Sequence, residues 1–272
     1  MTSVESGVSG LYLLPQGGDD EWKRLDEMHA GINEYLGNRL SLANFGRPDR
    51  ILELGCGSGA WAIQAAKTYP HADVQAVDAS PLPPRPLPSN LTFQRANIFE
   101  PLPFESQSFD LIHLRLVLFY VPNVHDILPR IIALLKPGGW LVIEDICLLN
   151  CRNSGPCHEE LFRITDRYMR SRACDPCIGE NLEAILKESR SLVDLSSLRV
   201  DLPFYETSQE DPLAPLAKVM KTSVVGAMTG PLSAELVADG LTSELQAGFG
   251  REMEDARYKP AFCLHFYSAR KQ

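Results

Sequence analysis

The chain has 272 residues, 44% of them hydrophobic, and a formal net charge of −9 at pH 7. This hydrophobic content is sufficient for a globular core, whereas the acidic balance argues against nucleic acid as a partner, because binding to phosphate backbones depends on clustered lysine and arginine. No stretch reaches the roughly 18 apolar residues of a membrane span, and residues 1–10 lack the basic and apolar regions of a secretory signal, so we expect a cytoplasmic or nuclear protein without a membrane partner.

The first half of the chain shows an alternation of strands and helices. A helix is predicted over 19–45, because apolar residues recur three and four positions apart from Trp22 to Leu36. Strands are then predicted over 51–54, 74–77, 91–94, 109–114 and 140–146, and helices over 60–68 and 124–135. Strands that are separated by single helices and apolar on both faces predict a parallel sheet covered by helices on both sides.

The second half predicts further helices and two late strands. Helices are expected over 159–172, 179–189, 211–228 and 233–254, and strands over 198–205 and 261–270. We therefore predict one domain over 1–272, made of N-terminal lid helices (1–48), a cofactor-binding core (49–146), and substrate-side helices with C-terminal strands (147–272). The late strands would extend the sheet with an antiparallel hairpin at one edge. The helical spacing of Arg163, Arg167, Arg170 and Arg172 leaves a local basic patch as an alternative to a solvated helix face.

The most informative segment is a predicted strand that ends in a glycine-rich turn, Ile51-Leu-Glu-Leu-Gly-Cys-Gly-Ser-Gly59. Glycine lacks a Cβ and tolerates positive φ, so such a turn lets the backbone approach a ligand closely. The spacing differs from the dinucleotide-binding motif, and the Lys-Ser/Thr of a phosphate-binding loop is missing. An acid beside close-packed glycines suits a ligand with hydroxyls, an adenine and a zwitterionic amino acid, such as S-adenosylmethionine.

Polar residues follow the predicted strands where ligands of parallel sheets bind. Glu53 would orient the ammonium of a methionine moiety, or else stabilise the start of the next helix. Asp78 would accept hydrogen bonds from the two ribose hydroxyls, or else form an ordinary turn. Asn97 would accept from the adenine amino group while Ile98 packs on the ring, although a turn-forming asparagine is the alternative.

The order of these motifs resembles that of class I S-adenosylmethionine-dependent methyltransferases. The resemblance is carried by Glu53-x-Gly-x-Gly-x-Gly59, Asp78, Asn97, Phe109-Asp110-Leu-Ile and Leu135-Lys-Pro-Gly-Gly139. The chain is also similar to the fungal LaeA-like (UMTA-type) methyltransferases of secondary metabolism, in segments that include Ser9-Gly-Leu-Tyr12-Leu-Leu-Pro15, Arg24-Leu25-Asp26, His29, Asp78-Ala-Ser-Pro81 and Ile112-His113-Leu-Arg115. It departs at Asn97, where the wider family usually has Asp, and at Glu53, where many close relatives have Asp.

The resemblance implies a Rossmann-like fold with a mainly parallel seven-stranded sheet, helices on both faces and a helical lid. It also implies S-adenosyl-L-methionine as the cofactor, and closure of Tyr12 and the helix around Leu25 to His29 over it. The cofactor-binding residues expected on these grounds are Tyr12, Glu53, Gly55, Cys56, Gly57, Ser58, Gly59, Asp78, Ala79, Asn97, Ile98, Leu114 and Arg115.

Methyl transfer from a sulfonium requires chiefly an aligned nucleophile and the exclusion of water. A base is needed only when an oxygen or nitrogen must lose a proton, and histidine is the natural candidate near neutral pH. We consider His29 and His113 as bases, although His113 lies in an apolar strand and fits a core position equally well. Arg115, Tyr120 and His158 are the candidates for binding the acceptor.

The sequence thus predicts methyl transfer to a small, apolar acceptor in a closed pocket. One alternative is an S-adenosylmethionine-binding regulator of secondary metabolism that acts with protein partners. Another is a pseudo-methyltransferase that guides a different reaction, such as a cyclisation. An oligomer or a protein partner is left open.

The cysteines offer a further alternative. Cys174-x-x-Cys177 has a zinc-like spacing, but the surrounding residues Cys147, Cys151 and Cys157 are irregularly spaced. We therefore expect free thiols and no metal.

Overall fold

The computed structural model describes residues 18–208, 210–231 and 234–272, so the predicted contact of Tyr12 lies outside the described residues. Within these ranges, seven strands form one sheet in the order β3-β2-β1-β4-β5-β7-β6, which confirms the predicted seven-stranded sheet. The strands are β1 (Arg50–Leu54), β2 (Asp73–Asp78), β3 (Leu91–Arg95), β4 (Phe109–Arg115), β5 (Leu135–Arg152), β6 (Leu192–Pro203) and β7 (Ala261–Lys271).

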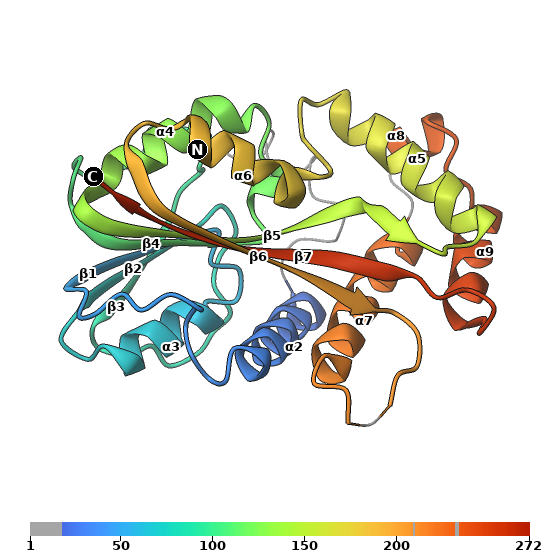
Figure 1. Ribbon diagram of the computed structural model, residues 1–272, viewed down its shortest axis with the longest axis horizontal. Helices are drawn as coiled ribbons and strands as arrows, with labels where there is room; N and C mark the ends of the chain where they lie inside the picture. The colour runs from blue at the N-terminus through green and yellow to red at the C-terminus, as the bar shows by residue number, and fades with distance from the viewer. Residues whose placement is uncertain (1–17, 209, 232–233) are drawn as a thin grey trace.

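Strands β1 to β5 run parallel, and helices cover both faces of the sheet (Figure 1). Helices α2 (Asp19–Tyr35), α3 (Ala60–Thr68) and α7 (Ala214–Thr229) lie on one face, and α4 (Val124–Leu134) and α6 (Ile178–Glu188) lie on the other. The chain first builds outward from β1 to β3 and then returns to place β4 on the other side of β1. This reversal is the point at which ligands of such sheets bind.

The last strand, β7, lies between β5 and β6 and runs antiparallel to both. The sequence predicts the fifth strand over 140–146, whereas β5 extends to Arg152. The added length has a simple cause, because β5 continues to pair with β7 beyond the parallel part of the sheet, as at Cys147 and Cys263. Strands β6 and β7 form the antiparallel pair that the sequence predicts at one edge of the sheet.

Helix α2 ends at Tyr35, well before the predicted end at residue 45. Gly37 and Asn38 have φ values of 64° and 61°, and a right-handed helix cannot continue through consecutive left-handed residues. The predicted helix over 233–254 is divided for a similar reason. Gly240, with a φ of 102°, separates α8 (Ala234–Ala238) from α9 (Ser243–Glu254). Helix α5 spans Pro156–Arg170.

The cysteines differ from the expectation of free thiols. Cys147 on β5 and Cys177 before α6 form a disulfide, whereas Cys56, Cys157, Cys174 and Cys263 take no part in one. Among the described residues, the group that could hold a metal consists of the disulfide pair and Glu180. A metal there would need both sulfurs as thiolates, so the zinc-like spacing of Cys174 and Cys177 is not realised as a ligand set in this structure.

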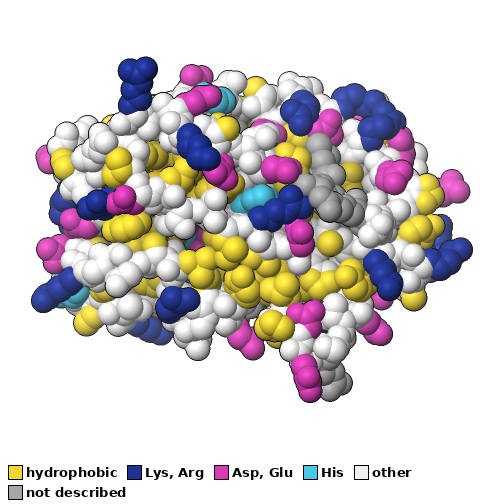
Figure 2. All heavy atoms as spheres, viewed as in Figure 1, with side chains coloured by type: hydrophobic (Ala, Val, Ile, Leu, Met, Phe, Trp, Pro, Cys, Tyr) yellow, Lys and Arg dark blue, Asp and Glu magenta, His cyan; other side chains and the backbone are white. Residues whose placement is uncertain are grey.

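The arginines on α5 and just after it do not form the alternative basic patch. Each contacts a neighbour: Arg163 pairs with Glu160, Arg167 donates to the carbonyl of Asp239, Arg170 pairs with Asp166, and Arg172 stacks on the ring of Tyr168. On the face shown in Figure 2, Lys and Arg side chains are interspersed with Asp and Glu. In the described part of the chain, no helix is long and apolar enough to cross a bilayer.

Candidate active site

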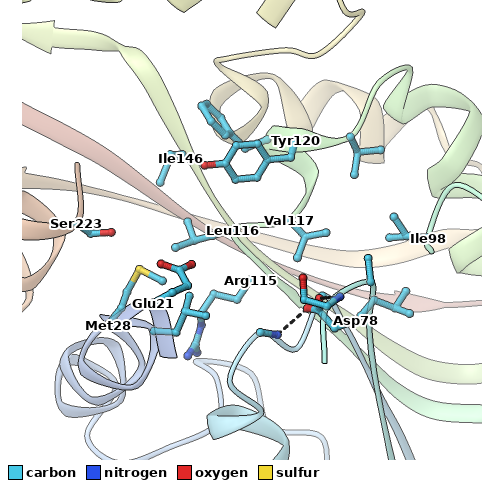
Figure 3. A pocket seen from close by; sticks show the side chains of 18 of the residues that line it. Glu21, Met28, Asp78, Ile98, Arg115, Leu116, Val117, Tyr120, Ile146 and Ser223 are labelled. Carbon is cyan, nitrogen blue, oxygen red and sulfur yellow. Dashed lines mark hydrogen bonds between the residues drawn. The ribbon is translucent and has the colours of Figure 1, made fainter. Parts of the chain in front are cut away.

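A cavity opens at the carboxyl ends of β1, β2 and β4, where the strand order reverses (Figure 3). Its walls are the glycine-rich turn, the segments after β2, β3 and β4, the short helix η1 (Leu118–Tyr120), and helices α2 and α7. The predicted site residues that line it are Gly55, Gly57, Asp78, Ala79, Asn97, Ile98, Arg115 and Tyr120.

The glycine-rich turn is built as the sequence predicts. Gly55 and Gly57 have φ values of 70° and 55°, in the left-handed region that favours glycine. The Gly55 N–H donates to the carbonyl of Val77 at 2.8 Å, which fixes the turn against β2. A Cβ at Gly55 would overlap the side chain of Val117. The turn and the loop after β4 therefore meet closely because position 55 has no side chain.

Asp78 joins the glycine-rich turn to the cavity. Its carboxylate accepts the Gly57 N–H at 2.7 Å and the Ser80 N–H at 2.8 Å. Burial raises the pKa of Asp78, and these backbone donors oppose the rise. Each oxygen retains a second lone pair for a ligand, and the side chain lies at the cavity wall (Figure 3).

The segment after β3 supplies Asn97 and Ile98 to the same cavity. The Asn97 side-chain oxygen accepts the Phe99 N–H at 3.0 Å, so this residue does form the local turn of the alternative interpretation. Because a carbonyl oxygen has two lone pairs, the turn does not exhaust its capacity to accept hydrogen bonds.

Glu53 lies beside the turn without lining the cavity, and its side chain is 4% exposed. Burial is the largest effect on its carboxyl group and raises the pKa of Glu53 to about 8, although the nearby Arg115 opposes the rise. One carboxylate oxygen, Oε2, has no hydrogen-bond partner among the described residues. Glu53 is therefore protonated in the folded protein at neutral pH.

This burial predicts how stability depends on pH. Between its ordinary value of 4.5 and about 8, Glu53 holds a proton in the folded state that the unfolded state has lost. The free energy of unfolding should therefore fall as the pH rises through this window. In Glu53→Gln this contribution disappears, so urea denaturation at pH 5, 6.5 and 8 should show a shallower fall than in the parent protein. Glu34→Gln, at an exposed position of α2, is the control, and parallel curves for the parent protein and Glu53→Gln would contradict the assignment.

His113 does not reach the cavity, which corrects its candidacy as a base. Its ring is fully buried and stacks on Trp61 with a centroid separation of 3.8 Å. Nδ1 lies 3.5 Å from a Glu53 oxygen and Nε2 lies 4.0 Å from a Glu144 oxygen. Burial holds the pKa of His113 well below its usual range, so the ring is neutral and belongs to the core.

His29 is likewise turned away from the cavity. It lines a separate surface groove between α2 and α3 with Asn33 and Gln64, and its Nδ1 lies 3.0 Å from an Arg115 nitrogen. Burial, assisted by the Arg115 charge, lowers the pKa of His29 to about 4. Because Arg115 also pairs with the buried Glu144, His29 acts on the cavity only by helping to hold that guanidinium.

The other predicted site residues outside the cavity are buried in its surroundings. The His158 ring lies against Phe162 in a tilted arrangement and meets Phe249 edge to face, and burial lowers the pKa of His158 to about 4, so it is a core residue rather than a substrate ligand. Four further residues are buried without lining the cavity: Cys56, Ser58, Gly59 and Leu114.

Several lining residues were not expected from the sequence. Glu21, Arg24, Leu116, Val117 and Ser223 line the cavity. The sequence does contain a signal that Glu21 lines the cavity. Leu25 and Met28 follow it four and seven positions later and therefore share its face of the helix. Asp145 was also missed. It is buried on β5 and accepts the Phe119 N–H at 3.3 Å, which holds η1 and Tyr120 at the cavity.

A family model described as a methyltransferase domain matches residues 26–189. The chain belongs to this family. Methyltransferase str2 of Strobilurus tenacellus is 43% identical over 274 residues, which cover 99% of each protein. The secondary metabolism regulator laeA of Aspergillus flavus is 28% identical over 96% of this chain and 74% of its own length. These similarities confirm the resemblance to class I and LaeA-like methyltransferases.

A solved structure has the same fold. Phosphoethanolamine N-methyltransferase 2 of Haemonchus contortus, determined with phosphomonomethylethanolamine and S-adenosylhomocysteine, has a TM-score of 0.52 to this methyltransferase. Its sequence identity is 18%, and the match covers 90% of this chain and 52% of that one. The Rossmann-like class I methyltransferase fold expected from the sequence is therefore confirmed.

Proposed function

We propose that this protein binds S-adenosylmethionine in the cavity and transfers its methyl group to a small-molecule acceptor. The observation that carries the proposal is the Asp78 carboxylate, which the Gly57 N–H holds at the cavity wall. A carboxylate at the tip of the second strand can accept hydrogen bonds from both ribose hydroxyls. Membership of the methyltransferase family, and the match to a methyltransferase over the full length of the chain, support methyl transfer as the reaction.

The other predicted residues are assigned to the adenine and to the methionine part of the cofactor. Ile98 would pack on the adenine, and Asn97 would accept from its amino group. Arg115 lines the cavity with its guanidinium held by Glu144 and His29, so we assign it to the methionine carboxylate. Glu53, close to the turn, would lose its proton when the ligand's ammonium binds nearby, because a neighbouring positive charge lowers the pKa of an acid, and would then balance that ammonium through water. The Gly55 to Gly59 turn allows the backbone to approach the ligand closely.

The bound cofactor supplies a methyl group on a sulfonium, whose departure leaves a neutral thioether. The protein must then align the acceptor with this methyl group and exclude water. Helices α2 and α7 supply Leu25, Met28, Met220 and Met228 to the cavity. We propose that α2 acts as the lid over the cofactor-binding core, and that the helices after β5 provide the acceptor side.

Incubation with S-adenosylmethionine labelled in its methyl group, together with an organic extract of small metabolites, tests the proposal. We expect the label to enter an extractable compound in the presence of the protein, and much slower transfer with Asp78→Ala at the same cofactor concentration. Label found in protein alone would contradict small-molecule methylation and favour a regulator that acts on proteins. Conversion of a metabolite without label would favour a pseudo-methyltransferase.

A further inference from the structure

Leu116 follows β4 in a strained backbone conformation. Its φ is 56°, and this left-handed region is unfavourable for a bulky side chain because the Cβ atom crowds the following carbonyl oxygen. Such strain persists only where the surrounding structure fixes it, and it clusters at functional sites. Six other described residues besides glycine have a positive φ: Asn38, Gln107, Asn123, Asn153, Ala173 and Asp194. Among these seven residues, Leu116 alone lines the cavity.

The left-handed turn places three consecutive side chains on one wall of the cavity. In a strand, neighbouring side chains point to opposite faces of the sheet. The end of β4 follows this rule, since Leu114 is buried in the core and Arg115 lines the cavity. A continued strand would turn Leu116 away again, yet Arg115, Leu116 and Val117 all line the cavity (Figure 3). The change of direction at Leu116 therefore brings its side chain to the site.

Contacts on both sides hold Leu116 in this conformation. Its N–H donates to the carbonyl of Glu144 on β5 at 2.7 Å. Further along the loop, the Phe119 N–H donates to the buried Asp145 carboxylate at 3.3 Å, which fixes η1. Between these two points, Val117 packs against the glycine-rich turn. The backbone is thus fixed before and after Leu116, and these contacts offset the strain at this residue.

The three side chains face the part of the cavity that the proposed function gives to the methionine of the cofactor. Asp78 is assigned to the ribose and Arg115 to the methionine carboxylate, so the sulfur and the carbon chain lie between these two residues. Figure 3 shows Leu116 and Val117 between Asp78 on one side and Ser223 on the other. Leu116 is only half-buried, so part of its side chain is open to a ligand.

We propose that Leu116 is a positioning residue for the methionine part of the cofactor. Its side chain packs on the carbon chain and the sulfur, and the left-handed turn keeps Arg115 and Val117 on the same wall. The sulfonium is thereby held in one orientation relative to the acceptor, as an in-line transfer requires. The strained turn lowers the stability of the fold and is retained for this contact. This inference rests on the proposed methyl transfer and adds a residue to its site.

Two ligands that differ in the methionine part test the contact. S-adenosylhomocysteine contains this part, whereas adenosine ends at the ribose. Calorimetry on the full chain should show that Leu116→Ala binds S-adenosylhomocysteine about 10-fold more weakly than the parent protein, because three carbon atoms leave the contact. The affinity for adenosine should stay unchanged. A general distortion of the cavity would weaken both ligands, so the difference between them is the decisive measurement.

Two further variants separate the side chain from the backbone. Leu116→Gly lacks the side chain but accepts the left-handed conformation. It should lose affinity for S-adenosylhomocysteine as Leu116→Ala does, and it should unfold at a higher urea concentration than Leu116→Ala. Leu116→Ile has the same atoms, but a β-branched residue resists this conformation. It should unfold at a lower urea concentration than the parent protein and bind S-adenosylhomocysteine more weakly, because Arg115 and Val117 move with the turn.

Gln107 supplies the matched control. It has the same φ of 56°, but it is exposed and lies outside the cavity. Gln107→Gly should bind both ligands as the parent protein does. Unchanged binding of S-adenosylhomocysteine by Leu116→Ala, or equal losses for the two ligands, would overturn the positioning role alone. A Leu116→Gly variant that is no more stable than Leu116→Ala would overturn the role of strain. Failure of the parent protein to bind S-adenosylhomocysteine would instead overturn the proposed function, and this inference with it.

Discussion

Replacement of Asp78 by alanine is expected to weaken the binding of S-adenosylmethionine about 100-fold or more. The variant loses the acceptor for two ribose hydroxyls, and each hydrogen bond to a charged group contributes about 1.5–3 kcal/mol. It also leaves the Gly57 N–H of the glycine-rich turn without its carboxylate partner. Titration calorimetry with S-adenosylmethionine and S-adenosylhomocysteine measures the loss directly.

Two companion variants make the Asp78 experiment specific. Asp78→Asn retains one side-chain oxygen and should show an intermediate loss of about 10-fold, because a neutral acceptor forms weaker hydrogen bonds than a carboxylate. Asp73→Ala removes the exposed acid at the opposite end of the same strand, where it pairs with Arg50, and should bind the cofactor normally. Equal affinity of the parent protein and Asp78→Ala would remove Asp78 from the ribose site.

Replacement of Gly55 by alanine is expected to lower the free energy of unfolding by about 2–5 kcal/mol. A left-handed conformation costs a residue with a side chain about 1–2 kcal/mol, and the new methyl group would overlap the stiff, β-branched Val117, which adds about 1–3 kcal/mol for overpacking. Urea denaturation measures the loss of stability. Because Val117 lines the cavity, cofactor binding should weaken in the same variant.

A matched control separates the two causes of this loss. Gly138 has a φ of 80°, and a Cβ built there would meet nothing within 4 Å. Gly138→Ala should therefore show only the cost of the backbone conformation. The double variant Gly55→Ala/Val117→Ala removes the overlap and should recover part of the stability that Gly55→Ala loses. If Gly55→Ala is no less stable than Gly138→Ala, the contact between the turn and the loop after β4 is not tight.

The fold follows from local patterns that the sequence displays. Helix α3 has the predicted bounds, and β1 to β4 differ from prediction by at most one residue at either end, because apolar runs and glycine-rich turns mark them directly. The end of α2 was missed because Gly37 and Asn38 stop the helix, whereas the apolar periodicity had been extended past them. The length of β5 depends on pairing with β7, which lies more than a hundred residues away and leaves no local signal.

The cavity-lining residues that follow strand tips, such as Gly57, Asp78 and Asn97, were accessible to sequence reasoning. The positions of the histidine side chains could not be predicted in this way, because they depend on which elements pack beside them. The strand register places His113 beside Glu53 of β1, in the interior of the sheet. On α2, one step from Met28 to His29 turns the side chain about 100° around the helix axis, away from the cavity and toward α3. The contact of Arg24 with Ser223 could not be predicted because it joins two helices that are far apart in the chain.

The position of β7 has a consequence for how the molecule is made. Strand β7 follows the other six strands of the sheet in chain order, yet it is an interior strand, between β5 and β6. Until residues 261–271 have been synthesised, β5 presents a long unpaired edge, and such edges invite pairing with other chains. Nascent or truncated chains that lack residues 261–271 are therefore the species most exposed to aggregation, and the need for chaperones should fall once β7 has paired with β5.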